Sequence, residues 1–129
     1  MMQPHIVMVL GDDVGWANVG WHSRGSAEVV TPNLDELVSE GLELDQMFAF
    51  KYCSPSRSAL QTGRNPIHVN VVNLNTEHNP LDPVSGFAGI PTNMTGIAEK
   101  LTAAGYHAHA VGKWDCGMAT ERHTPMGRG

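Results

Sequence analysis

Short apolar runs alternate with helical patterns along these 129 residues, and this alternation constrains the fold more than any other feature. The run HIVMVL, residues 5–10, stops at a glycine and is typical of a strand buried on both faces. Residues 42–50 and 106–111 are predicted to form two further strands. Strands separated by helices imply right-handed crossovers, so the sequence predicts an α/β fold with a mostly parallel sheet and flanking helices.

Helices are predicted at three places between and after these runs. TPNLDELVSEG, residues 31–41, has a threonine cap, a proline at the first helical position and a glycine suited to a left-handed stop. In SPSRSALQTG, residues 54–63, Ser54 is the expected cap and Gly63 the stop. Residues 95–105 repeat the pattern, with Thr95 as the cap and Gly105 as the stop. The stretch 65–93, rich in Asn and Pro, is predicted to be a long irregular connection, either functional or an insertion.

Charge and hydropathy limit the partners. The formal net charge is −5 and the basic residues do not cluster, which argues against nucleic acid or an anionic membrane as a partner. The run 5–10 is too short to span a membrane, and we expect no targeting segment because no basic leader precedes it. Two cysteines, Cys53 and Cys116, do not make a disulfide framework.

Polar side chains follow each predicted strand where it ends. Residues 12–13 are two aspartates after the first strand, residues 53–57 follow the second, and residues 112–115 follow the third. Ligands of parallel α/β sheets collect beyond the carboxyl ends of the strands, so we expect these groups to converge. Two adjacent carboxylates there favour a hard divalent cation such as Ca²⁺ or Mg²⁺, and a solvated turn is the alternative.

The second polar group suits a tetrahedral oxyanion. A helix start offers free backbone N–H groups, Arg57 offers a planar fork of donors, and Lys113 adds a compact positive charge. Sulfate and phosphate both fit this chemistry. Cys53 on its own would most often be a small buried hydrophobe, but helix starts and neighbouring cations favour a reactive side chain.

The segment CSPSRSALQTGR resembles the cysteine-type signature of the type I sulfatases, C-x-P-S-R followed by L-x-T-G-R. Three further pieces occur in the order of that family: PHIVMVLGDDVGW, TPNLDELVSEG and AGYHAHAVGKW. The resemblance therefore spans the chain. It implies an alkaline-phosphatase-like α/β fold, of which residues 1–129 would be the incomplete N-terminal portion of the catalytic domain.

The resemblance also implies the chemistry of the site. Cys53 would be converted to formylglycine by the formylglycine-generating enzyme, and the hydrated aldehyde would attack the sulfur of a sulfate ester and later expel sulfate. Asp12, Asp13 and the modified Cys53 would ligate one Ca²⁺. Arg57 would hold the hydroxyl of the formylglycine, and Lys113 would bind sulfate oxygens. The substrate would be a sulfated small molecule or carbohydrate.

One site residue departs from the family pattern. Asp115 stands in GKWDCG where the family usually has a histidine, which contacts the nucleophile and can accept the proton when sulfate leaves. An aspartate can also act as a general base, although its charge near bound sulfate needs an offsetting cation or a raised pKa. Asp115 is therefore a candidate catalytic residue. His123 could supply an imidazole, but we expect it on a surface loop, and we expect His107 and His109 at ordinary strand positions.

Three functions remain open from the sequence. The first is a portion of a sulfatase, inactive by itself because further metal ligands are absent and the small core makes it marginally stable. The second is a catalytically inactive sulfatase-like binding module. The third is a related metal-dependent hydrolase of phosphate esters in which Cys53 stays a thiol. A secretory, lysosomal or extracellular location is suggested by the family and by the glycosylation triplet Asn93-Met94-Thr95.

Overall fold

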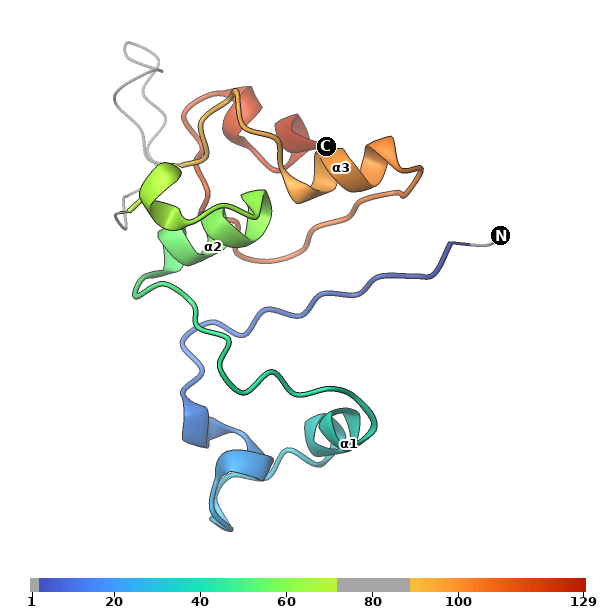
Figure 1. The fold of residues 1–129 in the computed structure, drawn as a ribbon, viewed down its shortest axis with the longest axis vertical. Coiled ribbons are helices and arrows are strands. Elements are labelled where there is room, and N and C mark those ends of the chain that lie inside the picture. The colour runs from blue at the N-terminus through green and yellow to red at the C-terminus, as the bar shows by residue number, and fades with distance from the viewer. Residues whose placement is uncertain (1–2, 72–88) are drawn as a thin grey trace. The chain divides into compact units, whose positions relative to one another are not determined.

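A computed structural model of the chain describes residues 3–71 and 89–129. The chain divides into two compact units, Met1–Met47 and Phe48–Gly129, each of which is described by itself. The first unit contains α1, and the second contains α2 and α3 (Figure 1). Most of the predicted connection 65–93 lies outside the described residues. The prediction that residues 1–129 belong to one catalytic domain stays a prediction.

In the first unit, α1 spans Pro32–Glu40, in agreement with the predicted helix. Thr31 precedes it, but its hydroxyl does not cap the helix: it donates to Asp35 Oδ1 (2.7 Å) and accepts the Gly20 N–H (2.7 Å). These bonds join α1 to the 3₁₀ turn η2, Gly20–His22, which follows η1, Trp16–Asn18. The predicted left-handed stop at Gly41 is wrong. Its φ is −108°, because its N–H closes a tight turn onto the Val38 carbonyl and the chain then continues extended.

In the second unit, α2 spans Cys53–Thr62, so the helix begins one residue before the predicted cap. The predicted Ser54 cap is wrong because Tyr52 is the capping residue, and the Ser54 hydroxyl bonds elsewhere, to Asp115. The predicted stop is confirmed. Gly63 has φ 65°, and its N–H donates to the Ala59 carbonyl (2.7 Å), the left-handed geometry that glycine adopts at little cost.

Helix α3, Ile97–Ala103, packs against α2 in the same unit. Gly96 precedes the helix, so the predicted cap at Thr95 is wrong by one residue, and Gly105 beyond the helix has φ 87° as expected of a stop. Three 3₁₀ turns complete the unit: η3, Pro66–His68; η4, Glu121–His123; and η5, Met126–Arg128. The buried apolar side chains of this unit include those of Ile90, Cys116 and Ala119.

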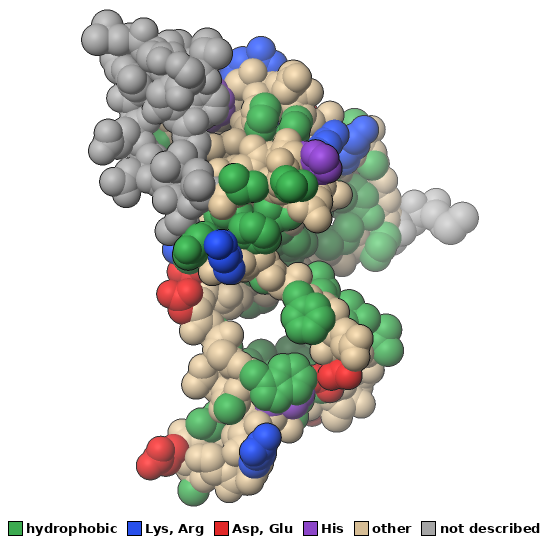
Figure 2. Space-filling view, turned by 60° about the vertical axis from the view of Figure 1, so that its left-hand side comes forward, with side chains coloured by type: hydrophobic (Ala, Val, Ile, Leu, Met, Phe, Trp, Pro, Cys, Tyr) green, Lys and Arg blue, Asp and Glu red, His purple; other side chains and the backbone are tan. Residues whose placement is uncertain are grey.

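The three predicted strands are not formed as strands in the described residues 3–71 and 89–129. Residues 5–10, 42–50 and 106–111 carry no strand pairing. Val7 is 85% exposed and Val9 87%, although their sequence pattern is that of a doubly buried strand. Hydrophobic side chains accordingly show on the surface in Figure 2. The sheet stays a prediction. Within the described ranges, no helix is long and apolar enough to cross a membrane.

Candidate functional site

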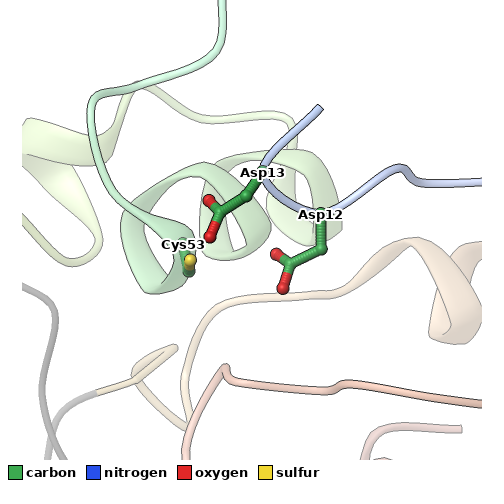
Figure 3. A group of neighbouring side chains, drawn as sticks. All are labelled: Asp12, Asp13 and Cys53. Carbon is green, nitrogen blue, oxygen red and sulfur yellow. The ribbon is translucent and has the colours of Figure 1, made fainter. Parts of the chain in front are cut away.

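The first turns of α2 carry the signature residues. Cys53 is the first residue of the helix and is half-buried (Figure 3). Ser54 and Arg57 are buried, and because they are three residues apart they lie on the same helix face. Ser54 Oγ donates to Asp115 Oδ1 (2.9 Å), and Arg57 Nη1 donates to the Lys113 carbonyl (2.6 Å). The helix that presents Cys53 is therefore bonded directly to the loop that carries Lys113 and Asp115.

The loop 112–116 holds its two charged side chains close together. Lys113 Nζ lies 3.9 Å from Asp115 Oδ2, while the other carboxylate oxygen accepts the Ser54 hydroxyl. Asp115 has φ 51°, a left-handed conformation that costs a non-glycine residue about 1–2 kcal/mol. Such strain persists where the surroundings fix the residue, and the contacts to Ser54 and Lys113 do so here. The Lys113 ammonium offsets part of the negative charge of Asp115.

Two residues within the loop, Trp114 and Cys116, anchor it to the rest of the unit. Trp114 Nε1–H donates to both the Gly117 carbonyl (2.9 Å) and the His123 carbonyl (2.9 Å). Cys116 is 1% exposed, and burial raises the pKa of its thiol to about 11. The positive charge of Arg57 opposes this rise in pKa without cancelling it. Cys116 is thus a protonated core residue, in contrast to the half-buried Cys53.

His123 is not on the surface, so that expectation is wrong. It is 2% exposed, and its Nδ1 lies 2.8 Å from Thr120 Oγ1. Burial is the main cause that lowers the pKa of His123, and the charges of Arg128 and Arg122 lower it further. The packing of η4 and η5 encloses this imidazole, which sequence polarity alone does not reveal. His107 and His109 are exposed in a segment that is not a strand.

Two of the three predicted metal ligands, Asp12 and Asp13, lie in the first unit. Asp12 and Asp13 are exposed at a bend that follows residues 5–10, and Figure 3 shows their carboxylates. Asp13 has φ 54°, and among the described residues the other non-glycine positions with left-handed φ are Arg24 and Asp115. Two of these three are predicted site residues, and such backbone strain clusters at functional sites. Carboxylate oxygens suit Ca²⁺, but two side chains supply only part of the six to eight oxygens it takes.

Within Phe48–Gly129 the structure thus brings Arg57, Lys113 and Asp115 into one bonded group. Asp12 and Asp13 belong to the other unit, and a metal site shared with Cys53 stays a prediction. Ser54 was missed as a partner of Asp115. A serine at a helix start predicts a helix cap, so its contact with Asp115 was not expected. Its place inside the signature was the available signal. No comparable signal marked the double hydrogen bond of Trp114.

Comparison with known proteins agrees with the signature. The Sulfatase family matches residues 4–129. Arylsulfatase J of Mus musculus is 35% identical over 127 residues, covering 98% of this chain and 20% of that protein. Arylsulfatase H of Homo sapiens is 37% identical over 91% of this chain and 21% of that protein. The N-acetylgalactosamine-6-sulfatase of Homo sapiens is 39% identical, over 93% and 23%.

The chain spans about a fifth of the length of these curated relatives. No solved structure is a significant match to it.

Proposed function

Because the chain belongs to the sulfatase family, we propose that it carries the nucleophile and the sulfate-binding lysine of a sulfuric ester hydrolase. One observation supports this most strongly. The signature helix α2 begins at Cys53, and its Ser54 and Arg57 are bonded to the loop of Lys113 and Asp115. Two segments far apart in the sequence thus meet through the residues that the chemistry needs.

In the proposed site Cys53 is the precursor of formylglycine. Once formed, that group supplies a hydrated aldehyde that attacks the ester sulfur and can release sulfate without a water nucleophile. Cys53 is half-buried at the first position of α2, where the positive end of the helix dipole favours an anion. Arg57 Nη1 donates to the Lys113 carbonyl, so we assign Arg57 the positioning of that loop in addition to the formylglycine hydroxyl.

Lys113 and Asp115 complete this side of the site. The Lys113 side chain is 43% exposed, and we assign it to the oxygens of the sulfate group. Asp115 stands in the place of the usual histidine, and we assign it the proton that moves when sulfate leaves. Its charge is offset by Lys113, 3.9 Å away. The carboxylate can accept a proton, and the ammonium can bind an anion.

Asp12 and Asp13 are the proposed ligands of one Ca²⁺, together with an oxygen of the modified Cys53. Their oxygens suit this hard cation, and the remaining ligands must come from elsewhere. The ion would act as a Lewis acid and as an orienting template. The predicted parallel sheet would support this arrangement, because it would bring the ends of residues 5–10 and 42–50 to one edge.

The proposed substrates are sulfate esters of small molecules or carbohydrates. The names of the relatives, arylsulfatase and N-acetylgalactosamine-6-sulfatase, support this class. The formylglycine-generating enzyme is the proposed protein partner, and it implies a secretory, lysosomal or extracellular route. An inactive binding module is the second candidate, because Asp115 replaces the usual histidine.

Mass spectrometry of the complete natural protein tests the proposal. Trypsin releases YCSPSR, residues 52–57, and WDCGMATER, residues 114–122, so each cysteine lies in its own peptide. We expect Cys53 as formylglycine and Cys116 as an unmodified thiol, together with cleavage of an aryl sulfate that Cys53→Ala abolishes. An unmodified Cys53 in protein made with the maturing enzyme contradicts the sulfatase mechanism and favours a phosphate ester hydrolase. A modified Cys53 without activity favours the inactive module.

A further inference from the structure

Arg128 in η5 is a buried cation with many partners. Its side chain is 4% exposed, and Nη2 donates to the carbonyls of Ile90 (2.6 Å) and Pro91 (2.9 Å). Nη1 donates to the Met94 carbonyl (2.6 Å) and lies 3.6 Å from Glu99 Oε1. A buried guanidinium is tolerated only when its donors and its charge are met. The terminal nitrogens of Arg128 meet this condition at three carbonyls of the segment 89–94, while its buried Nε has no hydrogen-bond partner among the described residues.

That segment lies against the loop of the candidate site. The Ile90 N–H donates to the Cys116 carbonyl (3.0 Å), and the Ile90 side chain is buried. Gly89 approaches so closely that a Cβ would overlap the Cys116 carbonyl oxygen and lie 2.7 Å from Gly117 Cα. The position of residues 116–117 therefore depends on the position of residues 89–90.

Lys113 and Asp115, which precede Cys116 in the same loop, are bonded to α2. Arg57 holds the Lys113 carbonyl and Ser54 holds the Asp115 carboxylate. Residues 113–117 are thus held by α2 near Lys113, by the segment 89–94 near Cys116, and by the bond from Trp114 to the His123 carbonyl. Loss of the support near Cys116 leaves that end of the loop less firmly held.

We propose that Arg128 is a positioning residue for the candidate site: by fixing residues 89–94, it keeps residues 113–117 where Lys113 and Asp115 meet α2. Arg128 itself contacts neither of those side chains in any bond described above. The catalytic consequence rests on the proposed function, whereas the effect on the loop is independent of it. The two can therefore be measured separately.

Hydrogen–deuterium exchange of the complete natural protein measures the effect on the loop. Arg128→Lys keeps the charge but replaces a planar fork with a point donor that cannot reach three carbonyls. We expect amides of residues 114–117 to exchange about tenfold faster or more, while those of α1 are unchanged. Arg122→Lys is the matched control, because exposed Arg122 makes one long bond (3.5 Å) to the same segment, at the Thr92 carbonyl. Unchanged exchange at 114–117 in folded Arg128→Lys overturns the proposal.

Glu99→Gln covers the case in which Arg128→Lys does not fold. It keeps the guanidinium and its three carbonyl partners and removes only the opposing charge at 3.6 Å. We expect a smaller acceleration of exchange at residues 114–117, in the same direction. No acceleration in this variant contradicts the proposal.

Steady-state kinetics measure the catalytic consequence. We expect Arg128→Lys to lower kcat/KM for an aryl sulfate by about 10- to 100-fold, since small displacements of catalytic groups have effects of that size. In a Lys113→Ala background the same substitution should cost far less, because residues that act through one another are not additive. Fully additive losses overturn the positioning of Lys113. A wild-type protein that cleaves no sulfate ester, yet shows the exchange response, refutes the proposed function and supports the positioning.

Discussion

Asp115 connects α2 with Lys113 in the candidate site. It has left-handed backbone, accepts from Ser54 through Oδ1 and lies beside Lys113 through Oδ2. Asparagine tolerates the same backbone and keeps an oxygen for Ser54, but it has no charge and no basicity. These properties allow the structural and chemical roles of the residue to be separated.

We therefore expect Asp115→Asn to change the free energy of unfolding by less than about 1 kcal/mol and to lower kcat by roughly 10²- to 10⁴-fold. Urea unfolding and aryl sulfate hydrolysis by the complete natural protein measure the two quantities. Asp115→His installs the usual family residue, and its kcat shows whether an imidazole recovers the activity that the asparagine variant loses. An asparagine variant with wild-type kcat would show that Asp115 only orients its neighbours.

Cys116 predicts a loss of stability at alkaline pH. Burial raises the pKa of its thiol from 9.0 to about 11, so the folded state holds the proton more tightly than the unfolded state. The contribution of this pKa difference to the free energy of unfolding is complete below pH 9. It is lost as pH rises from about 9 to 11, so the free energy of unfolding falls by at most roughly 2–3 kcal/mol. Urea midpoints across this range should fall less in Cys116→Ala than in the wild type. Equal slopes would contradict the assignment.

The sequence led us to expect the start of α2 and the loop of Lys113 near each other. Arg57, Lys113 and Asp115 do lie in one bonded group, although the strands on which this expectation rested are not formed in the described residues. Burial could not be predicted from local pattern. His123 and Arg128 are polar residues in a polar segment, and only the tertiary packing of η4, η5 and residues 89–94 encloses them.

Among the elements, α2 ends at a glycine that requires a left-handed backbone. Gly63 has φ 65°, and a Cβ placed there would meet no atom within 4 Å. Gly63→Ala should therefore cost only conformational strain, about 1 kcal/mol of unfolding free energy, and Gly63→Asn should cost less. Thermal or urea unfolding checks the order of the two variants. A stabilised alanine variant would show that the helix does not need this stop.

The three helices were predictable and the strands were not confirmed, for a physical reason. A helix satisfies its hydrogen bonds within one segment, so the spacing of Leu34, Leu37 and Val38, with Pro32 at the first helical position, suffices to place α1. A strand needs a partner that is distant in the sequence. Residues 5–10 have the right pattern, but pattern alone does not supply a neighbouring strand.

The whole molecule exposes apolar surface that a monomer usually covers. Val7 and Val9 are 85% and 87% exposed, in an extended segment of high β propensity. We expect the isolated chain to associate at micromolar concentration, and Val7→Lys with Val9→Lys to reduce that association. Sedimentation at several concentrations measures it. A monomeric chain with a cooperative urea transition at several molar would contradict this expectation.

Trp114 gives the candidate site an optical probe of its own. The chain has three tryptophans, and Trp16 and Trp21 both lie in the first unit, so substituting these two leaves a single indole next to Lys113 and Asp115. Its N–H is shared between the Gly117 and His123 carbonyls, and release of either bond would change its surroundings. Fluorescence emission could then follow, in solution and in real time, whether ligand or pH moves the loop.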